Sequence, residues 1–121
     1  MDVMQVVIIG EAERKLENLQ TMLESVNETG PITAFNSCDD AIKNLGFEDQ
    51  AVLFIDYRNP EKKLDKAISE LIMHRAVNHI VLLQSRNAQK THFTHYTTSE
   101  VVFDDLSINV LKNLVNNIQF N

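Results

Sequence analysis

The segment Ala51-Val52-Leu53-Phe54-Ile55-Asp56-Tyr57-Arg58-Asn59-Pro60 contains the clearest indication of the fold. Its first five residues form an unbroken apolar run, which is typical of a parallel strand that is buried on both faces. The run ends abruptly at Asp56, and residues 57–60 then form a loop before a helical pattern begins. The segment therefore predicts a buried strand with an aspartate at its carboxyl end.

Short apolar runs and helical patterns alternate along the rest of the chain. Strands are predicted at Val6–Ile9, Ile32–Phe35, Ala51–Ile55, His79–Leu83 and Val101–Phe103. Apolar residues recur at helical spacing in four segments, which are Glu11–Val26, a helix that begins near Asp39 with Ser37 as its cap, Leu64–Ile72 and Leu106–Ile118. Residues 86–98 are polar, so we expect the helix there to be short or frayed.

Five strand–helix units in this order predict an open parallel sheet with helices on both faces, because right-handed crossovers leave few alternatives. In sheets of this kind, functional residues lie at the carboxyl ends of the strands, near the switch in strand order. The residues predicted at these ends are Gly10, Glu11, Asp56, Gln84, Ser85 and Asp104.

The size and composition of the chain are those of one globular domain. It has 121 residues and a net charge of −6, which argues against direct nucleic-acid binding because phosphate contacts need clustered lysines and arginines. Cys38 is the single cysteine, so no internal disulfide can form. Since the first residues lack the basic start and long apolar run of a signal peptide or membrane span, we expect a cytoplasmic protein.

Three stretches together make the chain resemble a CheY-like receiver domain of bacterial response regulators. Asp56–Pro60 is similar to the phosphoacceptor loop of that family, and Ser37–Ile42 to its small-residue turn into the second helix. The spacing from Asp104 to Leu111 resembles that from the family's lysine to a core leucine. The resemblance covers residues 1–121 as a single domain. It implies an α/β three-layer sandwich with a parallel five-stranded sheet in the order 2-1-3-4-5, an arrangement that flavodoxin-like proteins share.

The chain departs from the family's pattern at the magnesium site. The resemblance places two acidic residues after the first strand, where this sequence has Gly10 and Glu11. One carboxylate is therefore missing, and magnesium prefers short, well-placed oxygen ligands. The ligands that remain are Glu11, Asp56 and the backbone carbonyl of Arg58, so we expect at most weak Mg²⁺ binding and no required cofactor.

The residues that would contact a phosphoryl group differ as well. Gln84 stands where the family has a serine or threonine, Asp104 replaces its lysine, and Val101 replaces its aromatic residue. Ser85 could supply a hydroxyl only if the strand register shifted by one residue, which would move every side chain to the opposite face. The carboxylates of Asp56 and Asp104 would repel an added phosphoryl group.

Cations from nearby loops are the alternative source of positive charge, namely Arg58, Arg86 and Lys90. Without one of them, acidic neighbours would raise the pKa of Asp56. In a purely structural interpretation, Asp56 hydrogen-bonds local backbone, while Glu11, Asp104 and Asp105 favour the N-termini of helices.

Three further features are interpreted as structural. His92 and His95 would share a helix face, but a metal site needs three or four converging ligands, so we interpret them as surface residues. Cys38 is interpreted as a small buried hydrophobic residue. Only Gly10 follows the first strand, and a single glycine there argues against a dinucleotide-binding loop.

The resemblance implies a degenerate receiver, or pseudo-receiver, that acts in two-component signalling as a phosphorylation-independent interaction or dimerisation module and not as an enzyme. It would stand alone or regulate a longer protein. We expect contacts through the last two strands and helices with a histidine kinase, an output domain or a second copy, and no contact with nucleic acid or membrane. One alternative is a conventional receiver that a histidine kinase phosphorylates on Asp56. The other is a flavodoxin-like small-ligand binder or enzyme, although the sequence predicts no loop that builds a cofactor pocket.

Overall fold

A parallel five-stranded sheet forms the middle layer of the structure, a computed structural model that describes residues 5–10, 14–26, 30–44, 51–58, 62–73, 77–86 and 98–119. The strands are β1 (Gln5–Ile9), β2 (Ile32–Phe35), β3 (Ala51–Asp56), β4 (Val77–Gln84) and β5 (Thr98–Val102). Their order in the sheet is β2-β1-β3-β4-β5, and all four neighbouring pairs are parallel. This order confirms the predicted arrangement.

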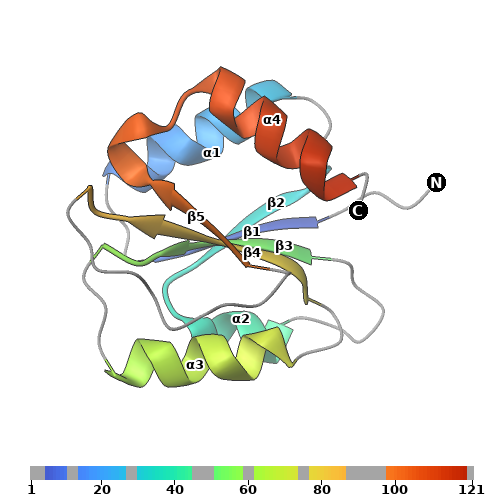
Figure 1. Ribbon diagram of the computed structural model, residues 1–121. Helices are drawn as coiled ribbons and strands as arrows, with labels where there is room; N and C mark the ends of the chain where they lie inside the picture. Colours follow the sequence, from blue (N-terminus) through green and yellow to red (C-terminus); the bar gives the residue numbers. More distant parts are fainter. Residues whose placement is uncertain are drawn as a thin grey trace.

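Helices cover both faces of the sheet (Figure 1). α1 (Arg14–Val26) and α4 (Ile108–Gln119) lie on one face, and α2 (Cys38–Asn44) and α3 (Lys62–Ile72) lie on the other. A short 3-10 helix, η1 (Phe103–Asp105), connects β5 to α4. None of the described helices is long and apolar enough to cross a bilayer.

The central strand β3 contributes side chains to both halves of the core. Leu53 and Ile55 pack into the cluster that α2 and α3 cover, while Val52 and Phe54 pack into the cluster under α1 and α4. Leu53, Phe54 and Ile55 are fully buried. Successive side chains point to opposite faces of the sheet because side chains alternate along a strand with a period of two. Every position before Asp56 is apolar because both faces of this strand are buried. The carboxyl end of β3 is therefore firmly anchored.

Several boundaries differ from the sequence prediction. β4 begins at Val77 instead of His79, and β5 spans Thr98–Val102 instead of Val101–Phe103. Within the described sheet β5 pairs with β4 alone, so it tolerates polar residues that a buried strand would exclude. The helix expected over residues 86–98 and the start of the first helix fall on residues 87–97 and 11–13, which lie outside the described residues.

Two serines cap helices. The backbone N–H of Asp40 donates to Ser37 Oγ over 3.2 Å, which confirms the predicted cap of α2. The final helix begins at Ile108 instead of Leu106, because Ser107 Oγ accepts the N–H of Val110 at 3.2 Å. Asp104 and Asp105 precede this helix, as predicted, but both lie in η1, and Ser107 supplies the cap.

Replacing Phe54 with alanine should lower the free energy of unfolding by about 3–5 kcal/mol, because it empties a fully buried site at the centre of the sheet. Urea denaturation of the two proteins measures the difference. Met73→Ala is the matched control, since Met73 is 82% exposed and its loss should change the unfolding free energy by less than about 0.5 kcal/mol. Equal effects of the two substitutions would contradict the assigned core.

Candidate functional site

Asp56 lies at the point where β3 leaves the sheet. It is the last residue of β3 and pairs with Leu83 of β4, after which the N–H of Tyr57 donates to the Leu83 carbonyl at 2.8 Å. The side chain of Asp56 is only 18% exposed. A mostly buried carboxylate needs hydrogen-bond donors or a counter-ion.

Arg58 supplies both to Asp56. Its Nε donates to Asp56 Oδ1 at 2.9 Å, and its terminal nitrogen Nη2 donates to Oδ2 at 2.8 Å. The backbone N–H of Arg58 also donates to Oδ1, at 3.2 Å. The guanidinium group is itself only 16% exposed, so water screens this two-pronged ion pair poorly. Of the two suggested cations that the structure describes, Arg58 and Arg86, Arg58 is the one that reaches Asp56.

The pKa of Asp56 reflects two opposing effects. Partial burial raises the pKa, while the side-chain and backbone hydrogen bonds and the charge of Arg58 lower it. The second group of effects prevails, so the pKa of Asp56 lies below its ordinary value and the carboxylate is ionised at neutral pH. The raised pKa expected from acidic neighbours alone does not occur, because a cation reaches the carboxylate.

Arg58 also connects Asp56 to two other strand ends. Its guanidinium carbon lies 4.3 Å from the centre of the Phe103 ring, the geometry of a cation–π contact. Its backbone carbonyl accepts the hydroxyl of Ser85, which follows β4, at 3.2 Å. The carboxyl ends of β3, β4 and β5 therefore meet at Arg58.

The described part of the site does not fit a magnesium ion. Both oxygens of Asp56 already accept hydrogen bonds from Arg58, and the Arg58 carbonyl accepts one from Ser85. The guanidinium group places a positive charge beside the carboxylate that a metal ion would need. No group of three carboxylate, histidine or cysteine side chains suited to a metal exists within the described ranges. Glu11 and Lys90 fall outside these ranges, so their predicted contributions stay predictions.

The other predicted switch positions lie on several elements of the fold. Gly10 follows β1, and its N–H donates to the Phe35 carbonyl at 3.0 Å. Gln84 is the last residue of β4 and is 8% exposed, and its Nε2 finds no hydrogen-bond partner among the described residues. Val101 lies on β5 and Asp104 on η1. Gln84 pairs with Val102, so the register shift that would bring Ser85 into the strand does not occur.

Arg86 forms an ion pair with a different aspartate, Asp105. Its terminal nitrogen lies 2.6 Å from Asp105 Oδ1, and the two side chains are 60% and 53% exposed. Exposed pairs of this kind contribute little to stability. Arg86 therefore ties the end of β4 to η1 and does not neutralise Asp56.

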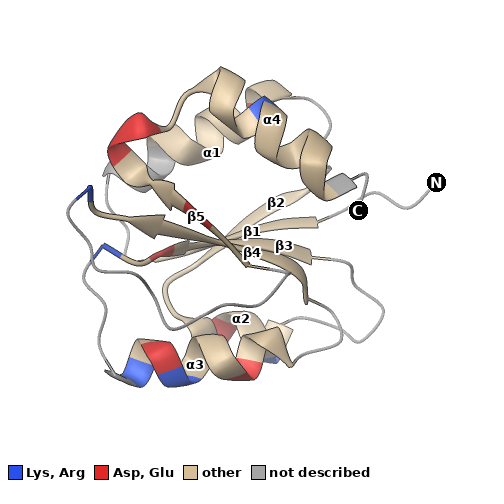
Figure 2. Cartoon of the chain, in the orientation of Figure 1, with Lys and Arg blue, Asp and Glu red and all other residues tan. Residues whose placement is uncertain are grey.

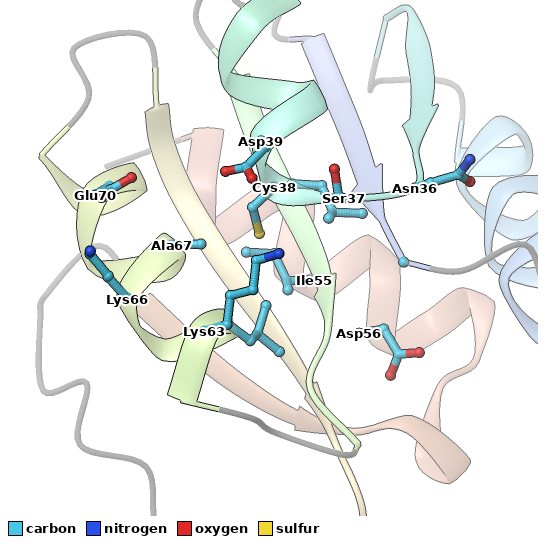
Figure 3. A pocket seen from close by; sticks show the side chains of 13 residues that line it. Asn36, Ser37, Cys38, Asp39, Ile55, Asp56, Lys63, Lys66, Ala67 and Glu70 are labelled. Carbon is cyan, nitrogen blue, oxygen red and sulfur yellow. The ribbon is translucent and has the colours of Figure 1, made fainter.

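A pocket of about 790 Å³ opens beside Asp56, between the carboxyl ends of β1 and β3 and the helices α2 and α3. Figure 3 shows the Asp56 side chain at one end and Lys66 and Glu70 at the other. Apolar side chains and charges of both signs line it: Ile9, Ile55, Leu64, Ala67, Lys63, Lys66, Asp39, Asp56 and Glu70. No pattern in the sequence predicts this pocket, because α2 and α3 meet only through the fold.

Two neighbours of the site are held in their neutral form. Burial, and then the charge of Asp39, raise the pKa of the Cys38 thiol to about 11, so this buried cysteine stays protonated at neutral pH, as its predicted structural role requires. Burial and a hydrogen bond to Asp65 raise the pKa of Tyr57, whose hydroxyl donates to that carboxylate. This bond ties the loop after β3 to α3.

Comparison with solved structures gives the fold. The chain is similar to the crystal structure of a response regulator receiver protein from Dyadobacter fermentans, with a TM-score of 0.69 over 96% of this chain and 98% of that one. The fold is that of a receiver domain. The two sequences are 16% identical, so the likeness concerns the fold alone. No protein-family model matches the sequence, and a search of curated proteins also gives no match.

Replacing Asp56 with asparagine should lower the free energy of unfolding at neutral pH by about 1–3 kcal/mol, because it removes a charge-assisted pair that is mostly buried. The pKa of Asp56 is lower in the folded protein than in the unfolded chain, so its charge stabilises the fold at pH values above the unfolded-state pKa of about 3.9. This stabilisation is lost as the pH falls through the folded-state pKa. The difference between the two proteins should therefore shrink below about pH 3.9.

Chemical denaturation across this pH range measures the effect. The control is Asp105→Asn, which breaks an ion pair of the same chemistry at an exposed position. A loss for Asp105→Asn as large as that for Asp56→Asn, or a difference that persists in acid, would contradict the assignment.

Proposed function

We propose that this chain is an atypical receiver domain of two-component signal transduction that binds a protein partner without being phosphorylated. The fold, shared with a response regulator receiver protein, supports the signalling context. The observation that carries the proposal is the bidentate ion pair between Asp56, at the acceptor position, and Arg58.

The chemistry of phosphoryl transfer explains why this pair matters. The acceptor carboxylate must attack phosphorus while cations offset the charge that develops on the phosphoryl oxygens. Arg58 already engages both oxygens of Asp56, and an attack by either oxygen would have to weaken this pair. Asp104 adds a negative charge on η1 and no cation. The arrangement favours a carboxylate that keeps its arginine over one that accepts phosphate.

A conventional receiver is the second candidate, and one observation favours it. Asp56 lines an open pocket that a small phosphodonor could enter, and Lys63 lines the same pocket. Arg58 would then act as a clamp on the phosphoryl group. The two candidates make opposite predictions about the covalent state of Asp56.

Incubation with acetyl phosphate and Mg²⁺ should therefore produce no mass increase in this protein. Beryllofluoride, which mimics a phosphoryl group, should leave the amide resonances of residues 56–58 unchanged. A receiver with an intact site, treated in parallel, shows that the reagents are active. A mass increment that disappears in Asp56→Ala would overturn the proposal and support the conventional receiver.

The proposed partner surface is the exposed face of α4 together with η1 and β5. The solvent-facing residues of this helix are almost uncharged, namely Ile108, Asn109, Lys112, Asn113, Asn116 and Asn117. Figure 2 shows the contrast with α3, where acidic and basic residues alternate along the helix. Because the centres of protein interfaces are depleted of charge, α4 suits a protein contact better than α3 does. A second copy, a histidine kinase and an output domain are the proposed partners.

Self-association is the form of this contact that can be tested with the chain alone. Sedimentation velocity over a range of concentrations should show a dimer, and Asn113→Arg should weaken it by about tenfold or more because a charge is buried in the contact. Ser69→Arg introduces the same charge at an exposed site on α3 and should leave dimerisation unchanged. Equal effects of both substitutions would exclude α4 as the contact face.

A further inference from the structure

The pocket between α2 and α3 has an apolar lining of the kind that small organic ligands need. Ile9, Ile55 and Cys38 line it and are buried, and burial keeps the Cys38 thiol neutral. Leu64 and Ala67 of α3 also line it and are only partly buried, so they leave apolar surface for a ligand to cover. The volume of about 790 Å³ lies within the range of roughly 300–1,000 Å³ that is usual for pockets that bind small molecules.

Four charged side chains line the pocket besides Asp56, and their charges balance. They come from α2 and α3, namely Asp39, Lys63, Lys66 and Glu70. Within the described part of the chain, none of these four side chains forms an ion pair or a hydrogen bond, whereas Asp56 is already in an ion pair. The pocket therefore presents charges of both signs that have no partner among the described residues.

Charges of opposite sign belong to the two walls of the pocket. In Figure 3 the Lys63 side chain extends from α3 into the pocket toward α2, which carries Asp39. Lys63 and Asp39 do not pair with each other in the described structure. A ligand with a single charge would be attracted to one wall and repelled by the other, while a ligand with both charges would be attracted to both.

We propose that this pocket binds a small zwitterion with an apolar body, the class to which apolar amino acids and their short peptides belong. The ligand carboxylate pairs with Lys63, its ammonium group pairs with Asp39, and its apolar body packs on Leu64 and Ala67. Exposed ion pairs contribute little by themselves, so the apolar body is needed to exclude water from both pairs.

This inference goes beyond the proposed function. α2 and α3 lie on the face of the sheet opposite α4, so a ligand in this pocket and a partner on α4 occupy separate surfaces (Figure 1). The main alternative occupant is a simple anion held by Lys63 and Lys66 alone. The experiment separates these two ligands by removing one charge of the probe at a time.

The probes are L-phenylalanine and the dipeptide L-leucyl-L-phenylalanine, whose apolar bodies differ in length. Methyl NMR follows the signals of Ile55 and Leu64, with Leu111 of the opposite core cluster as the internal reference. At least one probe should shift the Ile55 and Leu64 signals to saturation and leave the Leu111 signals unchanged. Its N-acetyl derivative, which lacks the ammonium group, and its carboxamide derivative, which lacks the carboxylate, should each bind about tenfold more weakly.

Substitutions on the two walls test the assigned partners. Lys63→Gln and Asp39→Asn should each weaken binding of the probe about tenfold. Lys63→Gln should have little effect on the carboxamide derivative, which has no carboxylate to pair with Lys63. Lys43→Gln and Asp40→Asn are the matched controls, because they make the same charge changes at exposed positions of α2 outside the pocket and should leave the affinity unchanged.

Three results would overturn the zwitterion site. They are the absence of saturable shifts with both probes, equal losses of affinity in the pocket variants and the control variants, and an N-acetyl derivative that binds as tightly as its parent. The last result would point to a simple anion instead. These measurements use neither a phosphodonor nor the α4 face, so each of these results would leave the proposed phosphorylation-independent function standing.

Discussion

The ion pair between Asp56 and Arg58 is the interaction on which the arrangement of the site depends. The end of a buried strand leaves a carboxylate with little access to water, and such a group needs a partner in the protein. Arg58 lies only two residues away, and the bend of the chain at Arg58 brings its side chain back to the carboxylate. The exposed pair of Arg86 and Asp105 has the same chemistry, but solvent screens it and little else depends on it.

The sheet makes this ion pair possible because it fixes the position of the strand end that carries Asp56. β3 is central and covered on both faces, so Asp56 projects from an anchored strand. The carboxyl ends of β4 and β5 lie beside Asp56 because the strands are parallel and in register. Ser85 and Phe103 are therefore brought to Arg58 from positions 27 and 45 residues away in sequence. Arg58 thus joins three strand ends, through its side chain to Asp56 and Phe103 and through its backbone carbonyl to Ser85.

The distribution of charge separates two surfaces of the domain. The pocket beside Asp56 carries charges of both signs, which favours no ligand of a single charge. The exposed face of α4 carries almost no charge, which is the property expected of a protein contact. The ion pair at Asp56 and the neutral face of α4 both support the proposed role as a module that binds a partner without being phosphorylated.

The apolar run before Asp56 and the alternation of strands and helices determined the fold, because burial on both faces of a parallel sheet leaves a local pattern in the sequence. The same local signals gave the Ser37 cap. The contact between Arg58 and Phe103 was decided only by the tertiary structure, since no local pattern specifies which strand end lies beside a given loop. The lowered pKa of Asp56 was decided there too, because it depends on which cation reaches a partly buried carboxylate.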